Sequence, residues 1–137
     1  MDKLERYVNR GYSVAETEMI YFSPDMDQTV KWFCDTLGWY GNVLDRNEEN
    51  IGTYGFVSDL PEEIMCSGAI IGRTIHIWPG EASERVVAFI RVKNIEKLRD
   101  YVITQGWDKI SEICKSEGTS KSCYVTAIDG SVLCFYE

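Results

Sequence analysis

The sequence predicts an α+β fold built from two β-α-β-β-β modules in one chain. The first observation is an internal repeat: residues 17–39 (TEMIYFSPDMDQTVKWFCDTLGW) and residues 85–107 (RVVAFIRVKNIEKLRDYVITQGW) begin 68 positions apart (85 minus 17) in a chain of 137. The second is that each segment runs from a short apolar strand through a polar turn into an amphipathic helix and ends on Gly-Trp. The third is that strand patterns follow each helix. Together they predict two copies of one supersecondary unit.

Each predicted helix has start and stop signals at equivalent places. Asp25 and Asn94 precede the two helices, and both residue types are favoured N-caps. Gly38 and Gly106 follow them, and glycine commonly ends a helix because it adopts the left-handed conformation at little cost. The apolar positions with helical spacing are Met26, Val30, Phe33 and Leu37 in the first module, and Ile95, Leu98, Tyr101 and Val102 in the second.

Three strands are predicted after each helix. They lie near residues 42–46, 51–58 and 69–78 in the first module, and near residues 110–115, 121–128 and 132–136 in the second. We expect residues 1–16 to form an N-terminal helical leader with a short helix from Lys3 to Val8. Residues 17–137 are then a single domain, with module 1 at about 17–80 and module 2 at about 85–137.

Composition and charge exclude several classes of protein. The chain has 22 Asp and Glu against 14 Lys and Arg, a net charge of −8, whereas nucleic-acid binding needs concentrated basic residues. Apolar runs such as residues 86–90 are too short to span a membrane, and the N-terminus lacks the apolar segment of a signal peptide. Five cysteines without a CxxC pair favour reduced thiols over a disulfide framework or a zinc ribbon. We therefore expect a cytoplasmic protein that binds neither nucleic acid nor membrane.

Three segments carry a resemblance to a known family. SPDMDQTVKWFCDTLGW, NIEKLRDYVITQGW and the terminal IDGSVLCFYE resemble the vicinal oxygen chelate superfamily, which includes glyoxalase I, bleomycin-resistance proteins and extradiol dioxygenases. The resemblance covers about residues 17–137. It implies that the two modules form a curled mixed sheet around a cleft with the helices outside, that the cleft takes a small molecule, and that the protein is a homodimer.

The resemblance also implies where a metal would bind. Catalytic members hold one divalent metal (Zn, Ni, Fe or Mn) on the first and last strands of each module, and these positions correspond here to Glu18, His76 and Cys134. At the fourth position stands Val86 or Val87, which cannot bind a metal. Three protein ligands plus solvent is a catalytic arrangement for zinc. The cofactor is thus a divalent metal on an incomplete ligand set, or there is none.

Each candidate metal ligand also has a structural interpretation. Glu18 opens an apolar strand, where desolvation would raise its pKa and suit it as the general base of glyoxalase chemistry; it is equally consistent with a solvated strand end. His76 is either a proton shuttle or a residue hydrogen-bonded within the sheet. Cys134 is either a thiolate ligand or a small apolar core residue.

Aromatic residues on the strands are the candidate ligand-binding residues. They are Trp78, Tyr54, Phe56, Tyr124 and Tyr136. Depending on the face of the strand, their side chains line either the cleft or the outer surface, and most of these rings would also belong to a core. Arg91 and Arg73 either pair with an anionic substrate group or form surface salt bridges.

Two functions remain open after these observations. One is a metal-assisted lyase or isomerase that resembles glyoxalase I. The other is a non-catalytic protein that binds, sequesters or senses an aromatic or cationic compound, which the acidic charge favours.

Overall fold

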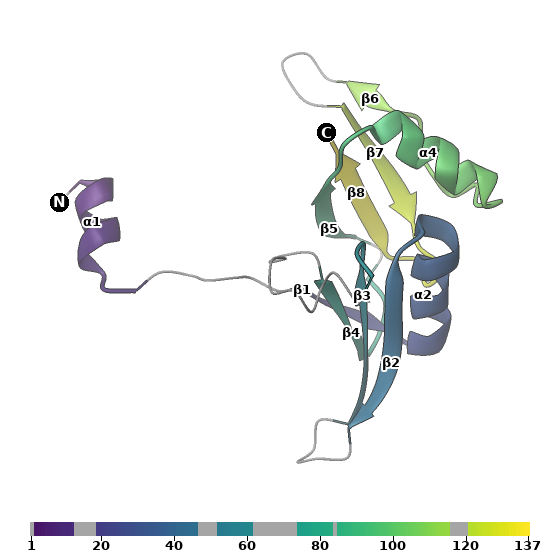
Figure 1. The fold of residues 1–137 in the computed structure, drawn as a ribbon, viewed down its shortest axis with the longest axis horizontal. Helices are drawn as coiled ribbons and strands as arrows, with labels where there is room; N and C mark the ends of the chain where they lie inside the picture. The colour runs from purple at the N-terminus through teal and green to yellow at the C-terminus, as the bar shows by residue number, and fades with distance from the viewer. Residues whose placement is uncertain (1, 13–18, 47–51, 62–73, 84, 116–120) are drawn as a thin grey trace.

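A computed structural model describes residues 2–12, 19–46, 52–61, 74–83, 85–115 and 121–137 (Figure 1). The N-terminal segment contains α1 (Lys3–Asn9). The first module comprises β1 (Met19–Ser23), α2 (Met26–Trp32), the π-helix η1 (Phe33–Leu37), β2 (Tyr40–Arg46), β3 (Gly52–Ser58) and β4 (Thr74–Pro79). The second comprises β5 (Val86–Arg91), α4 (Ile95–Thr104), β6 (Cys114–Lys115), β7 (Lys121–Thr126) and β8 (Val132–Tyr136).

Each module folds into its own four-stranded mixed sheet. The strand orders are β1-β4-β3-β2 and β5-β8-β7-β6. In both sheets the first strand pairs in parallel with the last strand of its module, and the other neighbours are antiparallel. Helices α2 and α4 lie on one side of the sheets (Figure 1). This topology confirms the predicted α+β fold of two equivalent modules.

One apolar core joins α2, η1, α4 and the inner faces of both sheets. Phe33 is fully buried within it, and its ring meets Tyr21 edge-on at 6.1 Å and Trp32 at 5.1 Å between centroids. Trp32 in turn packs against Trp107 of the second module, with 5.5 Å between the ring centroids. The aromatic residues of the two repeats therefore pack the modules against each other, as well as filling each module.

A partly buried hydrogen bond also links the modules. The Tyr21 hydroxyl of β1 donates to the Asp129 carboxylate, at 2.5 Å, in the turn between β7 and β8. The backbone N–H of Ser131 donates to the same carboxylate at 3.1 Å. Burial, followed by this bond to Asp129, raises the pKa of Tyr21 far above its ordinary value, so the hydroxyl stays protonated and remains a donor.

The helices begin and end where the four sequence signals place them. The Asp25 carboxylate accepts from the Gln28 N–H at 3.0 Å, and Gly38 and Gly106 have φ of 76° and 84°. Asn94 stands at the N-cap position of α4 as predicted, but its side chain makes no capping bond: it has φ 59°, whereas side-chain capping requires an extended backbone at that position.

The N-terminal helix is present where it was expected. It spans Lys3–Asn9, and Asp2 and Glu5 form a capping box at its start. It stands apart from both sheets in Figure 1, and Leu4 and Val8 on its surface are exposed. Among the described residues, no helix has the length and hydropathy needed to cross a bilayer.

Candidate functional site

Each sheet has a second face, opposite the helices, that carries exposed aromatic side chains. Phe22 of β1 is paired with Trp78 of β4, and their side chains are 50% and 42% exposed. In the other sheet, Phe89 of β5 and Tyr124 of β7 both pair with Cys134 of β8. Paired residues of neighbouring strands lie on the same face. We call these surfaces the open faces: the first comprises Ile20, Phe22, Phe56, His76 and Trp78, the second Phe89, Arg91, Tyr124, Cys134 and Tyr136.

His76 lies in an apolar setting at the middle of the first open face. Its strand neighbours in register are Ile20 of β1 and Phe56 of β3. The side chain is half-buried, whereas Ile75 and Ile77 on either side of it point into the core. Strand alternation therefore directs the imidazole away from the core and toward the open face. The role of His76 as a metal ligand or proton shuttle stays a prediction.

Cys134 occupies the centre of the second open face and is nearly inaccessible, with 4% of its surface exposed. Burial raises the pKa of its thiol, and a hydrogen bond with Tyr124 only partly offsets this effect. The thiol is therefore protonated at neutral pH. Because the thiolate is the form that binds metals, the setting of Cys134 opposes metal binding.

The described residues do not fit the predicted metal site. Glu18 lies outside the described residues. Val86 and Val87 offer no donor atom at the fourth ligand position. His76 and Cys134 belong to different sheets, and within the described ranges no three His, Cys, Asp or Glu side chains form a group that could hold a metal ion.

The predicted ligand-binding residues lie on the open faces wherever their side chains are described. Trp78 and Phe56 are on the first, and Tyr124, Tyr136 and Arg91 on the second. The Tyr54 side chain and the whole of Arg73 lie outside the described part of the chain.

Sequence reasoning missed two exposed aromatics of the open faces. Phe89 is 69% exposed but belongs to the uniformly apolar run VVAFI, in which no alternation is visible. Phe22 alternates with the buried Tyr21 and Ser23, and that alternation is the signal that identifies it.

The open faces have the chemistry of a ligand surface. Exposed rings from β1, β4, β5 and β7 offer flat apolar area for stacking, and the exposed Arg91 offers a guanidinium next to Tyr136 in the neighbouring strand. The net charge of −8 attracts cations to the protein at long range. Such a surface can hold a planar aromatic molecule and favours one that carries positive charge.

Comparisons with known proteins agree with this architecture. The bleomycin resistance protein domain matches residues 18–80. A glyoxalase-related enzyme from Clostridium phytofermentans is 40% identical, with a TM-score of 0.82 over 94% of this chain and 98% of that one. No curated protein matches the sequence.

More distant structures share the fold alone. The bleomycin-binding protein of Streptomyces verticillus, solved with copper(II)-bleomycin, is 15% identical, with a TM-score of 0.63 over 90% of this chain and 96% of that one. An antibiotic-binding protein from Streptomyces sp. CB03234 is 11% identical, with a TM-score of 0.63 over 91% of this chain and 98% of that one. The family itself is shown by the identity and coverage of the clostridial relative together with the domain match. The chain belongs to the glyoxalase/bleomycin resistance/dioxygenase superfamily, which is the vicinal oxygen chelate superfamily that its sequence resembles.

Proposed function

We propose that this protein binds a planar aromatic small molecule on its open faces, as a non-catalytic binding or sequestering protein. The observation that carries the proposal is the exposure of four rings on these faces, which ranges from 42% for Trp78 to 69% for Phe89. Soluble proteins seldom leave contiguous apolar surface uncovered unless something binds there. Stacking would cover this surface, and the acidic chain favours a cationic aromatic compound.

A homodimer completes the proposed site. The two open faces belong to separate sheets, and each is a single wall of aromatic side chains. A ligand enclosed on both sides needs a second wall, and an open face of a second copy supplies one of suitable chemistry. This proposal predicts a two-chain mass by analytical ultracentrifugation, and a dimer that weakens when Phe89 is replaced by Ser; a monomer at every concentration contradicts it.

Calorimetric titration tests the binding function. The probes are copper(II)-bleomycin, which a relative of the same fold binds, and the cationic aromatic dye proflavine. We expect saturable binding that Trp78→Ala weakens about tenfold, because a stacked ring contributes ~0.5–1.5 kcal/mol beyond its buried area. Tyr12→Ala is the matched control, since Tyr12 is 67% exposed but lies near α1. Absence of binding by both probes, or equal losses in the two variants, refutes the proposal.

A glyoxalase I-like lyase or isomerase is the second candidate, favoured by the name of the 40%-identical relative, a glyoxalase-related enzyme. In this candidate Glu18 is the general base and His76 a metal ligand. The test is elemental analysis of protein purified without chelators, alone and as Glu18→Gln and His76→Gln. One divalent metal per chain that both variants lose supports the enzyme; a metal content unchanged by either substitution counts against it.

A further inference from the structure

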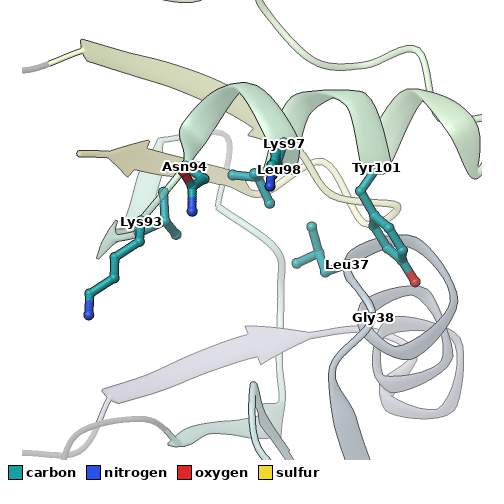
Figure 2. Close-up of a pocket in the computed structure, with 8 residues that line it drawn as sticks. Leu37, Gly38, Lys93, Asn94, Lys97, Leu98 and Tyr101 are labelled. Carbon is teal, nitrogen blue, oxygen red and sulfur yellow. The ribbon is translucent and has the colours of Figure 1, made fainter.

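A pocket of about 450 Å³ lies between the end of η1 and the first half of α4, away from the open faces. It is lined by Leu37, Gly38, Val92, Lys93, Asn94, Lys97, Leu98 and Tyr101. Figure 2 shows the side chains of Leu98 and Tyr101 extending from α4 toward Leu37 and Gly38 of the first module. None of these residues belongs to the open faces, so the pocket is a separate site.

The pocket is a basic spot on an acidic protein. Its lining includes Lys93 and Lys97 and no Asp or Glu, although the chain has a net charge of −8. In the described part of the chain, neither lysine takes part in an ion pair. Two carboxylates near α4 are engaged elsewhere: Glu96 pairs with Lys121, and Glu137 accepts the first backbone N–H of α4 at 3.0 Å. Both lysines are exposed at the edge of the pocket, and no described carboxylate pairs with either of them.

Apart from Asn94, the remaining lining is largely apolar and comes from both modules. Leu37 and Leu98 supply aliphatic surface, and the Tyr101 ring rests against Gly38. A Cβ at Gly38 would lie 2.9 Å from the Tyr101 Oη, so a larger residue would displace the ring. On the first-module side, the lining residues Leu37 and Gly38 are the last residue and the C-cap of the π-helix η1 (Phe33–Leu37). The π-helix is a conformation found frequently at functional sites.

We propose that this pocket binds a small organic anion, a carboxylate or phosphate carried on an apolar group about the size of one ring. Lys93 and Lys97 hold the anionic head by charge-assisted hydrogen bonds, while Leu37 and Leu98 pack against the apolar body. Because these residues come from η1 and α4, the bound anion also ties the two modules together. Binding to the folded state alone raises the melting temperature.

Amide-resolved NMR titration tests the proposal with four probes: phenyl phosphate, benzoate, neutral benzyl alcohol and inorganic phosphate. We expect phenyl phosphate or benzoate to shift the Gly38 and Leu98 signals saturably at millimolar concentration. Benzyl alcohol lacks the charge and inorganic phosphate lacks the apolar body, so both bind more weakly. Because signals of the open faces are recorded in the same spectra, binding there is distinguished from binding in the pocket.

Charge-matched variants decide whether the two lysines act locally. The double substitution Lys93→Gln and Lys97→Gln is expected to weaken binding about fivefold or more, given two partly exposed charge contacts. Lys3→Gln with Lys115→Gln removes the same charge elsewhere and is expected to leave the affinity unchanged. The spectra also show whether each variant is folded. Equal weakening by both pairs, or no saturable shift at Gly38 and Leu98 with either organic anion, overturns the proposal.

Discussion

The substitution Tyr21→Phe removes a single buried hydroxyl that joins the two modules. The phenol is 2% exposed and donates to Asp129, 108 positions away in the chain, at 2.5 Å. The ring contact with Phe33 survives the change, so packing is preserved and only the hydrogen bond is lost. The experiment therefore measures what the intermodule bond contributes to the free energy of unfolding.

The magnitude follows from the charge of the acceptor. A hydrogen bond to a charged group contributes ~1.5–3 kcal/mol, and Asp129 retains its bond from the Ser131 N–H, which places the expected loss near 2 kcal/mol. For a domain of this size that corresponds to a melting temperature lower by roughly 5–10 °C. Urea unfolding at pH 8 measures it, with Tyr40→Phe as the control, because Tyr40 is 49% exposed and no described residue bonds its hydroxyl.

The pH dependence gives a second, independent readout. The pKa of Tyr21 is raised in the folded state, so its stabilising effect is complete below the unfolded pKa of about 10 and declines as the pH rises toward the folded value. At pH 11 the difference in free energy of unfolding between wild type and Tyr21→Phe should be smaller than at pH 8 by about 1.4 kcal/mol. A difference independent of pH, or a loss no larger than that of Tyr40→Phe, refutes the reasoning.

Three further predictions follow from the core, the helix ends and the thiols. Phe33→Ala empties the fully buried centre of the aromatic cluster and should lower the free energy of unfolding by ~3–5 kcal/mol in urea. Gly38→Ala and Gly106→Ala both place alanine at positive φ, which should lower the free energy of unfolding by ~1–2 kcal/mol each. Only at position 38 would the new Cβ also meet a neighbouring ring, so the Gly38→Ala variant should have the lower melting temperature. Iodoacetamide at pH 8, followed by mass spectrometry, should label the exposed Cys114 and spare Cys123, because burial raises the pKa of Cys123 to about 11.

The repeated pattern made most of the fold predictable from the sequence. Start and stop signals such as Asp25 and Gly38 act over a few residues and can be read locally. The π-helix could not be predicted. Its hydrogen bonds join residues i and i+5, but the apolar residues of this segment still follow α-helical spacing. The start of α4 after Asn94 was predicted, but the group that accepts its first N–H was not, since it is Glu137, 42 positions along the chain.

The candidate sites were less predictable, because they depend on which strands become neighbours. Trp78 and Tyr124 were identified as aromatic strand residues, whereas Phe89 was hidden in a strand that is apolar on both faces. The basic pocket is assembled from Leu37 and Lys97, segments 60 positions apart (97 minus 37). No sequence pattern singles out either lysine as a binding residue, and only the packing of η1 against α4 places Lys97 and Leu37 in one site.

The negative net charge and the basic pocket act over different distances. At physiological ionic strength the Debye length is ~8 Å, so the charge of −8 influences a ligand mainly as it approaches. At contact, Lys93 and Lys97 act on an anion directly, and no described carboxylate lines the pocket to oppose them. The acidic surface thus favours cations at the open faces and slows, but does not prevent, the entry of an anion on the helix side. Since Trp78 and Lys97 are both exposed, replacing either one changes binding at its own site without disturbing the core.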